Sequence, residues 1–463
     1  MPSAFPSTST TLRCDQLGEI AWEAIGSPSA TQLNNHVSQP LAIEAPSVYD
    51  AFNENEFLSP YLPCMGAHNG VDLYRISYQT LVPETQTEAM ASGLLAIPQL
   101  PDRAELPMVS WQHGTIFEAE DAPSCIYENG AINLSPLGIP RSIETLLNVV
   151  TLAGNGYIVA AADYVGNGYA AGGNKQAPVP QAYGCKEATI QAIIDMLLAS
   201  RCLIQDLGRR SKQLFLHGWS QGGLNTQWLA QALQDRHARG ATEIPVPTRV
   251  AAVSAPSNLA RLCGYWMNSF GGDPNWLTPA TPILLGAYQH YYGMSDLLAR
   301  AIRPEYLELA NSIFEKTLDW NAVDFSLPTP ICRLYADVGS RVCLPQRPFD
   351  MLNPDFLAEY NQGEGEFFRQ VHANTALQGR FSMPCRFYGG GSDAVVPQWS
   401  SITLPEEHQR LAGSTLSTGV AVDAGMPVLR GRAGTPGATH RSTFLASLFH
   451  PGLNVRSWFD EAL

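Results

Sequence analysis

The sequence has few positively charged residues, which argues against polyanionic binding partners. Its 463 residues contain 28 Lys and Arg against 42 Asp and Glu, for a formal net charge of −14. No run of Lys or Arg could follow a phosphate backbone, so a nucleic acid is not an expected partner. A stretch of roughly eighteen consecutive apolar residues is also missing, so no transmembrane segment is expected.

Metal-binding and disulfide patterns are missing as well. Neither an H-E-x-x-H nor a C-x-x-C cluster occurs, so the sequence predicts no metal centre and no other cofactor. Nine cysteines, an odd number, are spread from Cys14 to Cys385, unlike the dense, even set of a small disulfide-stapled domain. Most are therefore expected to be buried thiols. Cys332 and Cys343 are close enough in sequence to bridge across a turn, and this pairing stays open.

The first residues lack the marks of a secretory signal. Residues 1–10 contain no basic segment followed by an apolar one. The chain is therefore expected to be cytoplasmic, or secreted if it is a trimmed mature form. Residues 1–69, Ser/Thr/Pro-rich at the start, are interpreted as an N-terminal extension without an assigned role. The sequence leaves the oligomeric state open.

The most informative motif that is present is Gly218-Trp219-Ser220-Gln221-Gly222. This G-x-S-x-G pattern follows an apolar run over 213–216 and precedes helical apolar spacing over 224–233. A strand that turns into a helix within one residue needs small residues two positions either side of the serine, where Cβ atoms would collide. The strand before and the helix after argue against a chance match. The segment therefore predicts a nucleophile elbow that exposes Ser220 near the positive end of a helix dipole.

Strand and helix patterns alternate on both sides of this elbow. Apolar strands are expected at 73–79, 91–97, 107–112, 157–162, 249–255, 385–388 and 419–422, and helices at 143–150, 187–199 and 443–449. Such alternation predicts an α/β fold with a doubly wound, mostly parallel sheet. A chain of 463 residues exceeds what one such sheet requires, so a second module is expected.

The alternation stops between the sixth and seventh predicted strands of the core sheet. Residues 257–380 are rich in helical periodicity and in aromatic side chains such as Trp266, Trp276 and Tyr292. Inserted there, this segment is expected to form a helical cap over the carboxyl edge of the sheet, which leaves 70–256 and 381–463 as the catalytic domain. Most of its aromatic residues are expected to form the core of the cap, while the cap as a whole shapes the substrate pocket.

A serine hydroxyl needs a base within hydrogen-bond reach, and the base needs a carboxylate to orient it. In this fold the order along the chain is serine, acid, histidine. Asp393 follows the seventh strand in a glycine-rich loop and is the favoured acid; Asp423, Asp337 and Asp350 are alternatives. His440 follows the last strand and precedes the terminal helix, and it is the favoured base.

Two backbone N–H groups must also stabilise the negative charge on the reacting carbonyl oxygen. Gln221, the residue after the nucleophile, is expected to supply one. The other is expected from the turn His113-Gly114-Thr115 after the third strand, through the amide of either Gly114 or Thr115. His113 itself is interpreted as a residue that holds this turn.

A competing motif lies at residues 166–171. The sequence GNGYAA follows a strand and matches G-x-G-x-x-A, with Glu187 about twenty residues further on, as in a dinucleotide fingerprint. Residues 172–180 contain Pro178 and Pro180 and do not read as the helix whose N-terminus would bind a pyrophosphate. An oxidoreductase is therefore disfavoured.

Taken together, these motifs resemble the secretory lipase, or lipase-A-like, branch of the α/β-hydrolase superfamily. The resemblance covers about residues 70–463 and is carried by SWQHGT at 110–115, ADYVG at 162–166, the elbow, the cap, Asp393 with Val396-Pro397, and His440. It implies a serine esterase or lipase that cleaves small-molecule or lipid carboxylic esters through an acyl-enzyme intermediate, without a cofactor.

Two other functions stay open on the same sequence. An acyltransferase or a peptidase could use the same three residues, and nothing in the sequence excludes either. A non-catalytic binding protein of this fold is the second alternative, against which the intact Ser220, Asp393 and His440 argue. Acyl and alcohol specificity depend on the cap and are left open.

Overall fold

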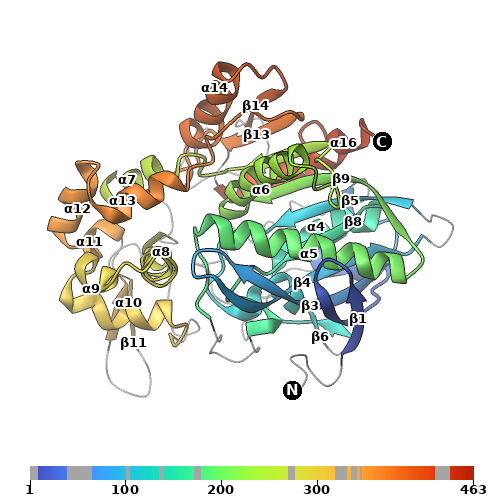
Figure 1. Ribbon diagram of the computed structural model, residues 1–463, viewed down its shortest axis with the longest axis horizontal. Helices are drawn as coiled ribbons and strands as arrows, with labels where there is room; N and C mark the ends of the chain where they lie inside the picture. The colour runs from blue at the N-terminus through green and yellow to red at the C-terminus, as the bar shows by residue number, and fades with distance from the viewer. Residues whose placement is uncertain are drawn as a thin grey trace.

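A computed structural model gives the architecture of the chain. It describes residues 9–38, 65–100, 105–128, 130–134, 140–171, 179–269, 277–318, 347–422, 438 and 440–463, and the backbone alone of 331–334 and 341–344. Within these residues the centre of the molecule is a ten-stranded sheet with helices on both faces (Figure 1).

The sheet combines an antiparallel edge with a parallel core, in the order β1-β2-β3-β4-β8-β5-β9-β10-β13-β14. The antiparallel strands are β1 (Thr10–Cys14), β2 (Gly18–Gly26), β3 (Val71–Val82) and β4 (Thr87–Pro98). The parallel strands are β5 (Glu105–Gln112), β8 (Ile158–Ala162), β9 (Arg210–Trp219), β10 (Arg249–Val253), β13 (Cys385–Gly390) and β14 (Ser417–Val422). The doubly wound, mostly parallel sheet predicted from the sequence is confirmed.

Part of the N-terminal segment 1–69, to which the sequence assigns no role, contributes two strands to this same sheet. β2 pairs antiparallel with β3, and β1 pairs antiparallel with β2. The helix α1 (Ala30–Ser38) follows and contacts α4 (Ile143–Thr151). β1 and β2 lie at the sheet edge with several exposed residues, so their sequences lack the continuous apolar run of a buried strand.

Helices bury the two faces of the sheet in two separate cores. On one face lie α5 (Lys186–Asp206) and α6 (Gln221–Ala238), which cross the near side in Figure 1. On the other face lie α4, α15 (His440–Phe449) and α16 (Val455–Asp460). No helix among the described residues is long and apolar enough to cross a bilayer.

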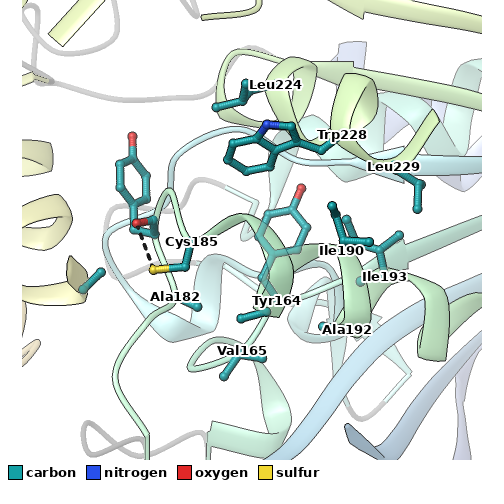
Figure 2. Packing of buried hydrophobic residues seen from close by; sticks show 14 of the residues in the cluster. Tyr164, Val165, Ala182, Cys185, Ile190, Ala192, Ile193, Leu224, Trp228 and Leu229 are labelled. Atoms are coloured by element: carbon teal, nitrogen blue, oxygen red, sulfur yellow. Dashed lines mark hydrogen bonds between the residues drawn. The ribbon is translucent and has the colours of Figure 1, made fainter. Parts of the chain in front are cut away.

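The core beneath the elbow forms where α5, α6 and the loop after β8 meet. Figure 2 shows Leu224 and Trp228 of α6 beside Tyr164 of that loop, with Ile190 and Ile193 of α5 below them. All five side chains are buried. This packing fixes the helix that begins directly after Ser220, so the elbow rests on a close-packed support.

Residues 257–380, here called the helical insertion, leave β10 and return at β13. Its helices are α7 (Leu259–Ser269), α8 (Leu277–Tyr291), α9 (Leu297–Ala301), α10 (Leu307–Phe314), α11 (Pro348–Met351), α12 (Pro354–Asn361) and α13 (Gly365–Ala373). Figure 1 shows them gathered at one end of the sheet.

The contacts of the helical insertion identify that end as the carboxyl edge of the parallel strands. Tyr288 Oη donates to the carbonyl of Gly184, in the loop after β8, at 3.1 Å. Trp266 Nε1 donates to the carbonyl of Val395, in the loop after β13, at 2.6 Å. Tyr288 and its neighbour Tyr291 are fully buried, in agreement with a role as core residues.

A short hairpin within the insertion contains two of the cysteines. The strands β11 (Ile331–Leu334) and β12 (Arg341–Leu344) pair antiparallel, and their register sets Cys332 directly opposite Cys343. The side chains of both cysteines lie outside the described residues, so the bridge considered from the sequence stays a prediction.

A disulfide that the sequence did not indicate joins Cys14 of β1 to Cys202 of α5. The two Cα atoms are 5.8 Å apart, and 188 residues separate the cysteines along the chain. Four other cysteines are free and buried, as expected, namely Cys125, Cys185, Cys263 and Cys385. The disulfide therefore ties the edge of the sheet to a helix that covers one of its faces.

We expect the paired substitution Cys14→Ser and Cys202→Ser to lower the free energy of unfolding by about 5 kcal/mol, the chain-entropy value for a loop of this length. Urea unfolding followed by fluorescence should show the lower midpoint, and reduction of the unfolded wild type before refolding should reproduce it. Equal midpoints for the oxidised wild type and the variant would contradict this role.

Candidate active site

Ser220 occupies a strained backbone conformation at the junction of β9 and α6. Its φ is 58° and its ψ is −123°, a region that residues other than glycine rarely adopt. The backbone around it is held by hydrogen bonds: Ser220 N–H donates to Val253 of β10 at 2.9 Å, and the Ser220 carbonyl accepts from Leu224 at 3.2 Å. The strain is thus offset by the sheet on one side and the helix on the other.

Gly218 and Gly222 make this turn sterically possible, as the sequence predicts. A Cβ at position 222 would lie 1.9 Å from the carbonyl oxygen of Gln112 on β5, and one at position 218 would lie 2.2 Å from the carbonyl oxygen of Gly222. Both oxygens belong to the backbone, so no side-chain rotation could relieve the clash. Only glycine therefore fits at either position.

The structure brings Ser220, His440 and Asp393 together in one hydrogen-bonded chain. Ser220 Oγ lies 2.9 Å from His440 Nε2, and His440 Nδ1 lies 2.8 Å from Asp393 Oδ2. The Asp393 side chain is 0% exposed and that of His440 is 12% exposed. With Nδ1–H donating to the carboxylate, Nε2 carries the lone pair that accepts the serine proton.

Backbone amides hold the Asp393 carboxylate in place. Its second oxygen, Oδ1, accepts from Val395 N–H at 3.0 Å and from Val396 N–H at 2.8 Å. These bonds fix the orientation of the carboxylate and leave Oδ2 directed at the imidazole. The loop after β13 therefore presents one acceptor oxygen in a fixed direction.

Trp219 packs against the imidazole and fixes its plane. The Trp219 ring centroid lies 4.9 Å from that of His440 and 4.8 Å from that of Phe444, and its indole Nε1–H donates to the His440 carbonyl at 3.2 Å. Both His440 and Phe444 belong to α15. The residue before the serine thus positions the helix that begins with the histidine.

The two candidates for the second oxyanion donor differ in their hydrogen bonds. Gly114 N–H already donates to a carboxylate oxygen of Glu144, on α4, at 2.8 Å. No partner for the N–H of Thr115 is found in the part of the chain that the structure describes. Gln221 opens α6, so no preceding helical turn accepts its N–H. The arrangement favours Gln221 with Thr115.

His113 is buried behind this loop and takes part in its support. Its Nδ1 lies 2.7 Å from the Gly114 carbonyl, its Nε2 lies 3.3 Å from the Asp163 carbonyl, and its ring stacks on Tyr164 with centroids 4.2 Å apart. Burial lowers the pKa of His113 to about 4, so the ring is neutral at neutral pH. These contacts agree with the structural role expected for it.

The Asp163 side chain is a further support that the sequence analysis did not identify. Its carboxylate accepts from Ser92 Oγ at 2.6 Å and from Ser124 N–H at 2.8 Å, and burial raises its pKa. A Cβ at Gly168 would lie 1.9 Å from Asp163 Oδ2. The signals in the sequence were an aspartate directly after an apolar strand and its place in the ADYVG segment at 162–166.

The two glycines of the competing motif at 166–171 allow close packing, Gly168 against Asp163 and Gly166 against the backbone of Pro180. The described residues that follow them, Tyr169–Ala171, form a three-residue 3-10 helix. A single turn offers no extended helix dipole to a pyrophosphate. The geometry therefore gives no support to a dinucleotide site at this loop.

The other candidate residues are placed as follows. Asp350, on α11, forms an ion pair with Arg347 at 2.9 Å. Asp423, Asp337 and Trp276 lie outside the described residues. Among the residues that are described, no group of three or more His, Cys, Asp or Glu side chains could hold a metal ion.

Comparisons with known proteins give structural matches only. No protein-family model matches the chain, and no curated protein matches it by sequence. The rice cell wall degrading esterase LipA from Xanthomonas oryzae superposes with a TM-score of 0.68 at 18% identity, over 99% of this chain and 100% of that one. A candidate hydrolase from Legionella pneumophila gives 0.68 at 18% identity, over 95% and 97%.

Candida antarctica lipase A in its closed state is also similar, with a TM-score of 0.53 at 15% identity, over 95% of this chain and 85% of that one. At such identities the similarity is one of fold. The chain has the α/β-hydrolase fold, as the sequence predicts.

Because a Cβ at position 222 would meet the β5 backbone, we expect Gly222→Ala to lower the free energy of unfolding by about 3 kcal/mol. The matched control is Gly264→Ala in α7, where the nearest neighbour would be Tyr360 Cε1 at 3.7 Å. That substitution should raise stability by up to about 1 kcal/mol, the helix-propensity gain of alanine over glycine. Urea unfolding of both variants checks the contrast, which equal effects would refute.

Proposed function

We propose that this protein is a serine hydrolase that cleaves carboxylic esters. The observation that carries the proposal is the continuous hydrogen-bonded chain from Ser220 Oγ through His440 to the buried Asp393. A serine at a strained elbow with a base and an orienting carboxylate in line has the geometry of an activated nucleophile. The fold shared with an esterase and a lipase supports the same reaction class.

In the first half of the reaction Ser220 Oγ attacks the ester carbonyl carbon. His440 Nε2 accepts the hydroxyl proton, and the Asp393 carboxylate stabilises the imidazolium that results. The carbonyl oxygen becomes an oxyanion that accepts hydrogen bonds from Gln221 N–H and Thr115 N–H. When the carbon–oxygen bond of the ester breaks, the imidazolium returns the proton to the leaving alcohol, and the acyl group remains on Ser220.

In the second half a water molecule attacks the acyl-enzyme. His440 takes a proton from the water, and collapse of the second tetrahedral intermediate releases the carboxylic acid and regenerates Ser220. Transfer to an acceptor alcohol instead of water would make the protein an acyltransferase, and an amide substrate would make it a peptidase. No specific contact in the described residues favours either over ester hydrolysis.

The helical insertion is proposed to act as a cap that determines specificity. It lies at the carboxyl edge of the sheet, where Ser220 and Asp393 are also found, and Trp266 contacts the loop that follows the acid. The substrates are proposed to be carboxylic esters, from small soluble esters to lipids. Tyr292 packs against the hydrophobic core, and its hydroxyl accepts from Asn374 at 2.9 Å within the insertion.

We expect Ser220→Ala to lower kcat by on the order of a million-fold, because the nucleophile is removed while the fold is kept. Hydrolysis of a short nitrophenyl ester, with and without an acceptor alcohol, measures turnover and separates hydrolase from transferase. A fluorophosphonate should label the wild type once, at Ser220, as read by peptide mass spectrometry. Normal turnover in the variant would exclude the mechanism.

A separate substitution tests the assignment of Asp393 as the acid that orients His440. Asp393→Asn should lower kcat by about ten-thousand-fold, because the imidazole then adopts the wrong tautomer. Asp350→Asn serves as the control, since Asp350 is paired with Arg347, and should leave kcat unchanged. If Asp423→Asn produced the large loss and Asp393→Asn did not, the acid would be Asp423.

A further inference from the structure

Glu144 is a half-buried carboxylic acid placed directly against the loop that supplies the proposed second oxyanion donor. Its Oε2 accepts the N–H of Gly114 at 2.8 Å. A Cβ on Gly114 would lie 3.1 and 3.2 Å from the two carboxylate oxygens and 3.2 Å from Trp219 Cε3. The carboxylate thus contacts the residue that immediately precedes Thr115, close to the tryptophan of the elbow.

Contacts at the start of α4 hold the backbone of Glu144 in place. It lies in the first turn of that helix, next to Thr145, whose Oγ1 accepts from Trp111 Nε1 of β5 at 3.2 Å. Just before the helix, Arg141 pairs with Glu118 and with Asp121, which follow the same loop. The start of α4 is therefore tied both to strand β5 and to the segment that leaves it.

The hydrogen bond to Glu144 constrains Gly114, the glycine of this loop. Glycine has a wide range of φ and ψ, so both of its peptides need contacts, and the peptide that follows is held at the Gly114 carbonyl, 2.7 Å from His113 Nδ1. An acceptor on its N–H fixes the preceding peptide plane, and the side chain of Thr115 is anchored by a 2.8 Å hydrogen bond to Tyr183 Oη. The Thr115 N–H lies between these two fixed points.

We propose that Glu144 is a positioning residue that holds the Gly114 peptide so that the Thr115 N–H faces the oxyanion. The role rests on the proposed function, because it matters only if a carbonyl reacts with Ser220. This role also distinguishes the two candidate oxyanion donors. Gly114 N–H donates to Glu144, and Thr115 N–H donates to the substrate oxyanion. Glu144 touches no reacting atom and acts through the loop.

Two substitutions of similar size test whether Glu144 acts as a hydrogen-bond acceptor or only by packing. Glu144→Met keeps the length of the side chain but cannot accept a hydrogen bond, whereas Glu144→Gln keeps an acceptor oxygen. We expect Glu144→Met to lower kcat by about a hundred-fold, the low end of the loss of one oxyanion donor, with KM changed by about two-fold or less. Glu144→Gln should stay within a few-fold of the wild type.

A trifluoromethyl ketone provides the second readout. Such a ketone forms a hemiketal oxyanion on the nucleophilic serine, so its inhibition constant should rise in Glu144→Met by the same factor by which kcat falls. Matched control variants are Glu84→Met and Glu84→Gln. Glu84 is likewise a half-buried carboxylate that accepts two backbone N–H groups, those of Glu187 and Ala188, both at 3.1 Å. They should lower stability and leave kcat and the inhibition constant unchanged.

The pH dependence of stability tests the burial of Glu144 without an activity measurement. Burial raises its pKa to about 7, with the charges of Arg441 and Asp121 facing it from α15 and from the loop. The folded chain then holds this proton more tightly than the unfolded chain does, so the stabilising contribution is lost as pH rises from about 4.5 through about 7. Glu144→Gln removes the titration, so its urea midpoint relative to the wild type should rise between pH 5 and pH 8.

Each outcome decides the proposal. Unchanged kcat and inhibitor affinity in folded Glu144→Met, a rise in KM alone, or equal losses in Glu144→Met and Glu84→Met would overturn the positioning role. If Glu144→Met does not fold, Glu144→Gln decides: a hundred-fold loss there would overturn the role of the acceptor. A wild type that turns over no ester and is not labelled at Ser220 would instead overturn the proposed function, and this role with it.

Discussion

The sharp turn at Ser220, from β9 into α6, is possible only because positions 218 and 222 are glycines and have no Cβ. The contact of Gly222 with the Gln112 carbonyl brings α6 against the end of β5, so that nucleophile and oxyanion loop adjoin through backbone rather than side chains. Backbone contacts of this kind do not relax by rotamer changes. The distances around the proposed reaction centre therefore follow from the pairing of β5, β9 and β10.

The parallel core explains why residues far apart in the sequence converge. Ser220 follows β9, Asp393 follows β13 and Thr115 follows β5, and all three strands end at the same edge. His440 comes from a helix on one face and is held by Trp219. Each group thus projects from a strand end or a helix start, which keeps the site more rigid than one built on loops alone.

The elbow, the parallel strands and the candidates Asp393 and His440 could be proposed from the sequence because each has a local pattern. Buried apolar strands, flanking glycines and chain order are properties of neighbouring residues. The role of Glu144 could not be foreseen, since it depends on where α4 begins relative to a loop about thirty residues earlier. For the same reason β1, β2 and the Cys14–Cys202 bond escaped notice: edge strands and distant cysteines acquire their partners only in the folded chain.

The Cys14–Cys202 bond closes a covalent ring that contains β2 to β8, together with α1, α4 and most of α5. Ser220, Asp393 and His440 all lie outside the ring, on the C-terminal side, whereas Thr115 lies inside it. A protease that cuts once between Thr115 and Cys202 would therefore leave a nicked molecule in one piece, with the donor loop still attached to the serine through the disulfide. Among the side chains that the structure describes, no disulfide joins the two sides of a cut between Ser220 and His440. The oxyanion loop is thus connected to the nucleophile by two covalent routes, the backbone and the disulfide.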